Sequence, residues 1–327
     1  KKTEMILYLV MGWMIIFTLD ELIKIIKENV SEYGLFTHIK DEPTGLDIDE
    51  LAYWVKRYKK EIPNIKPIFN LFPSYVSART LNNSYLGYLK EIVQKVGPEN
   101  IVFLGNDYYP FFEKETKLKM FCDLEDIKNV AYQNGKLKTH EFIQGGTWKG
   151  MRMPTIEEIS WQAYSFLAYG VKAISYFNLV CPIDRTNFTD CLIMTDGTIN
   201  NPKLLEEVGK LNFEVRAIGN ELINTDTVHA YHTNPKVSQV DVLPNDYFIE
   251  PINKNVEVII TEHDDKSLFM ITNADLDFEG EVKFKINTNK IIKVFDPFVK
   301  DYIDSPFNNG VLNIYLKKGK GFLFKLI

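Results

Sequence analysis

Apolar runs of strand length alternate with amphipathic helical segments through the first two thirds of the chain, and this alternation restricts the fold more than any other feature. The predicted strands are Met5–Phe17, Leu35–Lys40, Pro67–Leu71, Ile101–Leu104, Thr139–Gln144 and Val171–Phe177. The predicted helices, which have apolar residues at helical spacing, are Leu19–Val30, Asp49–Glu61, Ser84–Val96, Leu118–Asn134, Thr155–Tyr169 and Asn201–Leu222. Such alternation over short connections indicates a parallel sheet covered by helices.

The connections that follow the predicted strands differ from those that precede them. Polar and aromatic residues collect after the strands, whereas the connections leading into the strands are short and plain. This asymmetry favours a (β/α)8 TIM-type barrel over a doubly wound sheet, because a barrel collects its chemistry at the carboxyl ends of its strands. Eight strands close such a barrel and six are visible. Either the chain begins inside the domain, with N-terminal strands missing or atypical, or the barrel is incomplete.

The sequence changes character after Thr227. Short β-rich runs, separated by turn-forming residues, cover Val256–Thr261, Lys266–Asn273, Gly280–Ile286, Ile291–Phe295, Val311–Leu316 and Gly321–Leu326. Short strands at this spacing are typical of an antiparallel β-sandwich. We therefore predict two domains, a (β/α) barrel over residues 1–232 that is catalytic and a β-sandwich over residues 233–327.

The first apolar run, Met5–Phe17, has three interpretations: a membrane span, the core of a signal peptide, or a buried strand. It is shorter than the ~20 residues that cross a bilayer. No small-residue cleavage site follows it, and Thr18–Glu21 is instead typical of the start of a helix. We interpret the run as a buried strand of the barrel wall, preceded by strands that this chain lacks.

Charge and cysteine content narrow the choice of partners. The net charge is −6, with a sequence pI of about 5.6, which argues against nucleic acid as a partner. Cys122, Cys181 and Cys191 are too far apart for a metal-binding knuckle, and their odd number argues against a disulfide framework. We predict free, buried thiols, no metal and no cofactor. The oligomeric state and the compartment, cytoplasmic or secreted with the export signal absent from this chain, stay open.

Two adjacent carboxylates, Asp41 and Glu42, follow the strand Leu35–Lys40 and are succeeded by Pro43. Glycoside hydrolysis requires one protonated and one charged carboxyl group on either side of a sugar. Glu42 is the candidate acid, because the adjacent like charge of Asp41 would help to hold it protonated. The alternative interpretation is that Asp41 caps the next turn and Glu42 is solvated.

The second carboxylate is less well defined by the sequence. Asp107 ends the strand Ile101–Leu104 and precedes Tyr108 and Tyr109, which could orient it or stack on a sugar ring. Its structural alternative is an Asx turn before Pro110. Further candidates to line a sugar site are Trp148, Tyr176 and Asn178; Trp161, in the middle of a predicted helix, is more simply core.

Several segments together resemble a known family. They are the strand that ends in Asp41-Glu-Pro43, Asn70-Leu-Phe-Pro-Ser-Tyr75, Asn106-Asp-Tyr-Tyr-Pro-Phe111, Phe142-Ile-Gln144, and Arg152–Thr155 with Glu158–Trp161. In these segments the chain is similar to glycoside-hydrolase-like (β/α)8 proteins of gut and soil bacteria, relatives of the family-42 β-galactosidase type within clan A.

This resemblance implies a carbohydrate substrate and an acid/base at Glu42, with Asp41, Asn70, Tyr75 and Gln144 near the substrate. It also implies a nucleophilic glutamate at a later strand end, but that position falls at or near Gln144, which is neutral. The barrel could instead use Asp107, could invert, or could bind sugar without cleaving it. The leading hypothesis is a glycosidase that acts on poly- or oligosaccharides, and the alternative is a catalytically weak carbohydrate-binding barrel.

Overall fold

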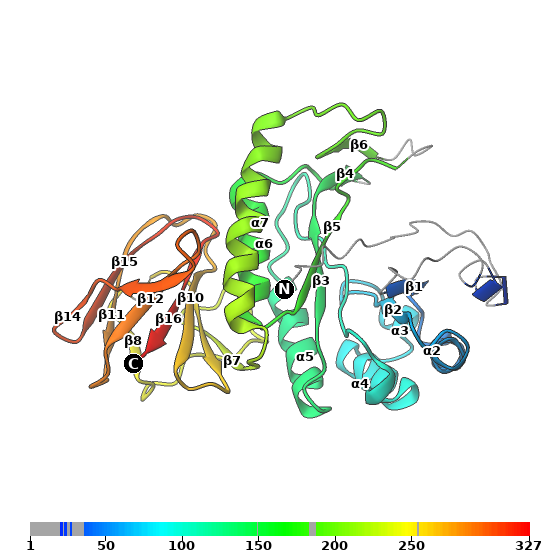
Figure 1. Cartoon of the computed structure of the whole chain (residues 1–327), viewed down its shortest axis with the longest axis horizontal. Coiled ribbons are helices and arrows are strands. Elements are labelled where there is room, and N and C mark those ends of the chain that lie inside the picture. The colour runs from blue at the N-terminus through cyan, green and yellow to red at the C-terminus, as the bar shows by residue number, and fades with distance from the viewer. Residues whose placement is uncertain are drawn as a thin grey trace. The chain divides into compact units, whose positions relative to one another are not determined.

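The computed structural model describes residues 36–148, 150–182, 188–253 and 255–327, together with Asp20, Glu21, Ile23, Lys24 and Lys27 (Figure 1). The predicted strand Met5–Phe17 and most of the helix Leu19–Val30 lie outside these residues. The chain divides into two compact units, Lys1–Asp107 with Asn129–His140, and Tyr108–Lys128 with Glu141–Ile327. Across the described residues, none of the helices combines the length and the apolar character that a bilayer span requires.

The first unit is built from parallel strands and the helices that connect them. Its elements are β1 (Phe36–Asp41), α2 (Ile48–Glu61), β2 (Lys66–Asn70), α3 (Ala78–Leu81), α4 (Tyr85–Val96) and the short 3-10 helix η1 (Pro98–Asn100). β1 pairs with β2 in parallel, and parallel bridges then join Leu71 to Asn106 and Leu104 to Thr139. Consecutive strand segments therefore lie side by side in chain order, with their carboxyl ends at one edge.

Local sequence explains where the helix α4 begins and ends. The hydroxyl of Ser84 accepts the Gly87 N–H at 3.1 Å and so caps the helix. One face of α4 is apolar and buried, from Tyr88 through Val96. The helix stops at Gly97, whose φ of 88° suits glycine but strains other residues.

The second unit combines helices, short strands and a β-sandwich. Before the sandwich it contains β3 (His140–Gln144), β4 (Gly146–Trp148), α6 (Ile156–Ala168), β5 (Ala173–Phe177), β6 (Phe188–Cys191) and α7 (Pro202–Leu222). Two elements are divided between the units: His140, the first residue of β3, belongs to the first unit, and α5 (Met120–Gln133) begins in the second unit and ends in the first. The predicted start of α6 at Thr155 is confirmed, because Thr155 and Glu158 form a capping box.

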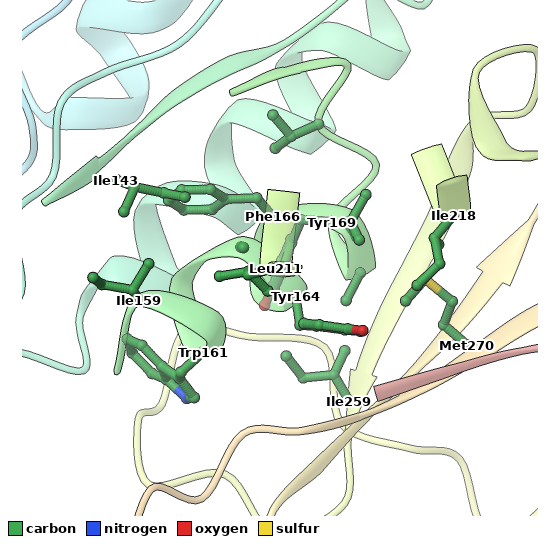
Figure 2. Close-up of a cluster of buried hydrophobic side chains, with 14 of the residues drawn as sticks. Ile143, Ile159, Trp161, Tyr164, Phe166, Tyr169, Leu211, Ile218, Ile259 and Met270 are labelled. Carbon is green, nitrogen blue, oxygen red and sulfur yellow. The ribbon is translucent and has the colours of Figure 1, made fainter. Parts of the chain in front are cut away.

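A large apolar core joins the helices of this unit to its sandwich (Figure 2). It includes Trp161 and Phe166 of α6, Leu211 of α7, and Ile259 and Met270 from the sandwich. Trp161 is fully buried and its indole N–H donates to the Ala274 carbonyl oxygen at 2.9 Å. The expectation that Trp161 is core is confirmed.

The sandwich consists of two antiparallel sheets. One has the order β13 (Asp301–Asp304), β12 (Ile292–Asp296), β16 (Gly321–Leu326), β10 (Leu268–Asn273), β9 (Val258–His263), β7 (Thr227–His232). The other has the order β14 (Phe307–Asn308), β15 (Val311–Leu316), β11 (Gly280–Ile286), β8 (Ile249–Pro251). In β11, Val282, Phe284 and Ile286 are buried while the lysines between them are exposed, so the period-two pattern of the sequence places one face of the strand in the core.

The closed barrel stays a prediction. The described residues show a mixed α/β structure with parallel pairings in the first unit, but the strands before the sandwich belong to separate two-stranded sheets (β1–β2, β3–β5 and β4–β6), and no closed barrel is present among them. The predicted division into residues 1–232 and 233–327 likewise stays a prediction.

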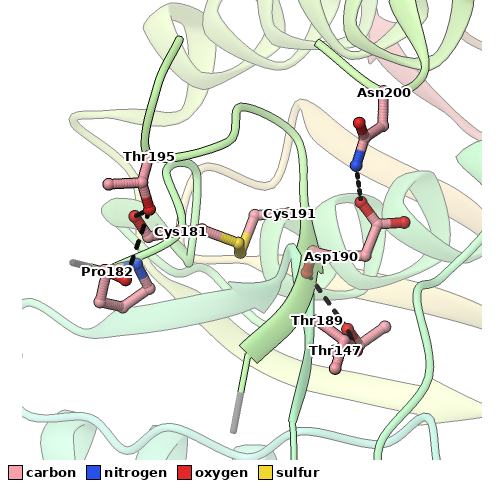
Figure 3. The surroundings of a disulfide bond; sticks show 8 residues. All are labelled: Thr147, Cys181, Pro182, Thr189, Asp190, Cys191, Thr195 and Asn200. Atoms are coloured by element: carbon pink, nitrogen blue, oxygen red, sulfur yellow. Dashed lines mark hydrogen bonds between the residues drawn. A yellow bond between two sulfur atoms is a disulfide. The ribbon is translucent and has the colours of Figure 1, made fainter. Parts of the chain in front are cut away.

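The prediction of three free thiols is wrong for two of the cysteines. Cys181 and Cys191 form a disulfide, with their Cα atoms 5.4 Å apart, whereas Cys122 is free and buried (Figure 3). Val180 forms a parallel bridge with Ile193, and Ile193 exchanges backbone hydrogen bonds of 2.9 Å with Leu179 and Cys181, which brings the two cysteines together. The odd number of cysteines did not exclude this pairing, because three cysteines can form one disulfide and leave one free thiol.

Candidate functional site

Asp41 and Glu42 stand where the sequence places them, at the carboxyl end of a strand. Asp41 is the last residue of β1 and is exposed. Glu42 has a φ of 44°, in the left-handed region that costs a non-glycine residue about 1–2 kcal/mol. Its backbone N–H donates to the carbonyl oxygen of Asn70 at 3.0 Å, so the end of β2 holds it in this conformation.

The loop after Glu42 is tied to the neighbouring helices. The hydroxyl of Tyr88, a fully buried residue of α4, donates to the Pro43 carbonyl oxygen at 2.6 Å. Gly45 donates its N–H to the Thr80 carbonyl oxygen at 2.9 Å, and a Cβ at this position would collide with the backbone of Leu81. The path of the acidic loop is therefore set by contacts with α3 and α4.

A buried amide connects the ends of neighbouring strands. Asn70, which is only 4% exposed at the end of β2, donates its side-chain N–H to Asp41 Oδ1 at 3.4 Å and also hydrogen-bonds the side chain of Asp107. Asn106, just before Asp107, bridges to Leu71 and donates its amide to the Tyr85 hydroxyl at 2.6 Å. Asp41, Asn70 and Asp107 thus lie together at the carboxyl edge of the parallel strands.

Asp107 is the electrostatically perturbed member of the group that we name the carboxylate cluster (Asp41, Glu42 and Asp107). Burial raises its pKa well above the ordinary value, and the negative charges of Glu42 and Asp41 raise it further. The hydrogen bond from Asn70 acts in the opposite direction. Asp107 Oδ1 is buried and has no hydrogen-bond partner among the described residues. Asp107 therefore retains its proton to a higher pH than an ordinary carboxyl group.

The nearby histidines do not supply a second acid. Burial lowers the pKa of His38, although Asp41, whose Oδ1 lies 4.0 Å from His38 Nε2, acts in the opposite direction. Burial, with a smaller contribution from His38, lowers the pKa of His140 to about 3. Both pKa shifts favour neutral imidazoles.

Two residues complete the description of this site in the first unit. Tyr75 lies beyond the end of β2 and is 41% exposed, so its ring is accessible. Tyr88 was not among the predicted site residues. Its helical spacing indicated only that it is buried, whereas the structure shows that its hydroxyl holds the Pro43 carbonyl oxygen. Burial raises the pKa of Tyr88, and the negative charges of Glu42 and Asp107 raise it further.

Several predicted residues of the second unit belong to an aromatic cluster (Tyr109, Phe142, Trp148, Phe177 and Phe188). The Trp148 ring lies 4.9 Å from that of Tyr109 and 5.4 Å from that of Phe188, measured between centroids. Tyr109 also stacks on Phe177 at 5.4 Å. Phe188 was not among the predicted site residues, and it reaches the cluster because β6 pairs with β4.

The remaining predicted residues of the second unit differ in their surroundings. Tyr108 is buried in the large apolar core. Tyr176 in β5 donates its hydroxyl to Asn212 Oδ1 at 2.7 Å. Asn178 follows β5, and its side-chain nitrogen is buried without a hydrogen-bond partner among the described residues.

Gln144 uses its amide group inside the protein. Its Oε1 accepts the Phe111 N–H at 2.9 Å, and its Nε2 donates to the carbonyl oxygens of Phe111 at 2.9 Å and Arg152 at 2.8 Å. The residue is fully buried. Gln144 thus fastens two loops together, and both of its N–H groups are occupied by backbone oxygens.

Described residues of the second unit line one cavity of about 290 Å³ and another of about 760 Å³, and none of the predicted site residues lines either of them. The part of the chain that the structure describes contains no group of three or more histidine, cysteine, aspartate or glutamate residues placed to bind a metal ion.

No family model matches the chain, and no curated protein matches it. Matching solved structures include an α-amylase from Geobacillus thermoleovorans in complex with acarbose, with 12% identity, a TM-score of 0.41, and coverage of 86% of this chain and 64% of that chain. An α-L-arabinofuranosidase from Thermotoga maritima has 13% identity, a TM-score of 0.43, and coverage of 95% and 74%. A β-galactosidase from the psychrophilic Marinomonas ef1 has 12% identity, a TM-score of 0.37, and coverage of 54% and 29%.

These three proteins are glycoside hydrolases. The chain spans less than two thirds of the length of the α-amylase and of the β-galactosidase. TM-scores below 0.5 are too low to assign a fold or an activity, and the relation to the family-42 type is not established by them.

Proposed function

We propose that the chain is a glycoside hydrolase that uses Asp107 and Glu42 as its carboxyl pair. The observation that supports this proposal is the raised pKa of Asp107 beside the charges of Glu42 and Asp41, at the carboxyl edge of the parallel strands. Glycosidases need one carboxyl group that carries a proton and one that is charged, with environments that separate their pKa values. The carboxylate cluster offers such an asymmetry.

The asymmetry reverses the roles expected from the sequence. Asp107, whose pKa is raised, is the proposed general acid: its proton passes to the glycosidic oxygen as the bond from that oxygen to the anomeric carbon breaks. Glu42 is the proposed charged partner, which attacks the anomeric carbon or activates a water molecule. Asn70 would orient Asp107 and Asp41 through its amide.

The substrate contacts remain proposals for each unit separately. In the first unit, Asp41, Asn70 and the accessible Tyr75 are the proposed contacts with sugar hydroxyls and faces. In the second unit, the candidates are Tyr109, Trp148, Tyr176 and Asn178, whose buried side-chain nitrogen has no hydrogen-bond partner among the described residues. Tyr108 is excluded because it is buried in the large apolar core. Gln144 is excluded from our proposal because its amide is occupied.

The test compares Asp107→Asn and Glu42→Gln on two kinds of glycoside. If Asp107 is the acid, Asp107→Asn should lower turnover of substrates with poor leaving groups by about 10²–10⁴-fold, but should preserve the bond-breaking step with an activated phenolate, which needs little protonation. Glu42→Gln should impair both substrates. Asp49→Asn, which removes an exposed carboxylate of α2, is the matched control and should leave turnover unchanged.

The opposite pattern, with Glu42→Gln selective for poor leaving groups, would return the acid role to Glu42. Full activity of both variants on a natural oligosaccharide would remove the carboxylate cluster from the mechanism. The anomer formed first, followed by proton NMR, distinguishes retention from inversion.

A second candidate function is carbohydrate binding without cleavage. The observation that favours it is Gln144, a neutral and fully bonded residue at the position where the family resemblance would place the nucleophile. No hydrolysis across a panel of aryl glycosides, combined with calorimetric binding of one of the sugars, would support this function over the first.

A further inference from the structure

The β-sandwich contains the cavity of about 290 Å³, which is lined from both sheets. Residues of the turn between β9 and β10, and the end of β16, contribute from the six-stranded sheet. Tyr247 and Phe248, before β8, and residues 287–290, after β11, contribute from the four-stranded sheet. The volume lies near the lower end of the roughly 300–1,000 Å³ of ligand pockets, which suits a molecule of monosaccharide size.

Aromatic side chains form part of the lining. Tyr247 and Phe248 lie with their ring centroids 4.8 Å apart, and Phe248 packs edge-on against Phe269 at 5.8 Å. Tyr231 of β7 supports Tyr247 at 5.1 Å. Tyr247 and Phe248 are only half-buried, so parts of their rings are accessible. An accessible aromatic surface can pack against the apolar C–H face of a sugar ring.

Polar groups stand next to this aromatic surface. Val258 and Ile260 of β9 point into the sandwich core, so the alternation of the strand places Glu262 on the same face. The Glu262 carboxylate pairs with Lys266 and is hydrogen-bonded by the Tyr231 hydroxyl. The cavity therefore has a fixed acceptor and an adjacent donor whose charges offset each other.

The segments that carry these groups are held in place by backbone hydrogen bonds. Asn287 N–H donates to the Phe248 carbonyl oxygen at 2.8 Å, which joins the end of β11 to the aromatic wall. On the other sheet, Leu326 N–H donates to the Ser267 carbonyl oxygen at 2.7 Å, beside the β9–β10 turn. The exposed Asn287 side chain lines the rim and carries both a donor and an acceptor.

We propose that this cavity is a binding site for one neutral pyranose unit, packed on Tyr247 and Phe248 and hydrogen-bonded to Glu262, Lys266 and Asn287. A wholly apolar ligand would remove Glu262, Lys266 and Asn287 from water without offering hydrogen bonds in exchange, which is unfavourable. Two lysines also line the cavity, but Lys266 is paired with Glu262 and Lys290 is exposed to solvent, so neither presents a desolvated charge that would favour an anion. A sugar ring has an apolar face and hydroxyl groups that both donate and accept, so it matches the two kinds of lining. The site is independent of the proposed catalysis, because none of its residues belongs to the carboxylate cluster.

The test uses the full chain and the methyl glycosides of glucose, galactose and xylose, with saturation-transfer NMR and calorimetry. Phe248→Ala should abolish binding at this site, and Glu262→Gln, which replaces a charged acceptor by a neutral one without loss of volume, should weaken it about tenfold. Phe298→Ala is the matched control: Phe298 is an exposed aromatic of the same sandwich and does not line the cavity. It should bind as the unchanged chain does.

Asp107→Asn separates this proposal from the proposed function. Binding that persists in Asp107→Asn and is lost in Phe248→Ala supports the cavity. Binding that is lost in Asp107→Asn but retained in both Phe248→Ala and Glu262→Gln belongs to the carboxylate cluster and overturns the cavity proposal while leaving the proposed function intact. Absence of binding for all three glycosides, or tighter binding of glucose 6-phosphate than of glucose at this site, overturns it as well.

Discussion

Replacing Asp107 by asparagine should change how the free energy of unfolding depends on pH. In the folded protein, burial and the charges of Glu42 and Asp41 raise the pKa of Asp107 well above its ordinary value. In the unfolded chain the pKa of an aspartate is about 3.9. Between these two pKa values the folded chain holds a proton that the unfolded chain has released. The stability that Asp107 contributes is therefore fully present below the unfolded pKa and is lost as the pH rises through the folded one.

The magnitude follows from the proton count. One proton bound only by the folded state gives a slope of about 1.4 kcal/mol per pH unit. Asparagine does not titrate, so Asp107→Asn lacks this loss of stability. We therefore subtract the free energy of unfolding of the unchanged chain from that of Asp107→Asn. This difference should rise with pH at up to this slope. It should level off once the folded Asp107 is ionised, and the pH at which it levels off gives its pKa in the folded protein.

Urea unfolding, followed by circular dichroism at a series of pH values from about pH 4 upward, measures this difference. When both proteins of the comparison also carry Glu42→Gln, the difference should level off at a lower pH, because this change removes one of the charges that raise the pKa of Asp107. Asp49→Asn, at a side chain that is 79% exposed, should change the free energy of unfolding by less than about 0.5 kcal/mol. Parallel pH curves for Asp107→Asn and the unchanged chain, or a difference that shrinks as the pH rises, would refute the reasoning.

The loop that carries Glu42 provides two further predictions, both measured by urea unfolding. Tyr88→Phe should lower the free energy of unfolding by about 1–3 kcal/mol, because it leaves the buried Pro43 carbonyl oxygen without its donor; a variant as stable as the unchanged chain would contradict this. Gly45→Ala should also destabilise by about 1–3 kcal/mol, because its Cβ meets the Leu81 backbone. The matched Gly209→Ala, in α7 where a Cβ meets open space, should stabilise by about 1 kcal/mol, and equal effects of the two alanines would rule out the packing argument.

The helices and strands that the sequence predicts well are those specified by neighbouring residues. Thr155 and Glu158 cap α6 through groups three residues apart, and the cap of α4 at Ser84 has the same local origin. The alternation of β11 placed Val282 and Phe284 in the sandwich core. These signals need no knowledge of the rest of the chain, because a helical turn or a strand pleat brings only close neighbours in sequence together.

The position of the acidic residues was also predictable, but their chemistry was not. A strand followed by Asp41 and Glu42 places both at a sheet edge, as the structure shows for β1. The sequence suggested that Glu42 would retain a proton, because Asp41 is its neighbour. In the structure the raised pKa belongs to Asp107, because burial has the largest effect on it and burial depends on segments remote in sequence.

The sequence alone thus determined the local elements, the strand-end acidic loop and the sandwich, since each depends on the spacing of residues within a short segment. Only the tertiary structure decided that Gln144 uses its amide on the backbone of Phe111 and Arg152, and that Cys181 pairs with Cys191. It likewise decided that Tyr88 holds the loop of Glu42. Each of these contacts joins residues that come together only when separate segments pack. Neither the composition nor the periodicity of the sequence predicts which residues of separate segments meet.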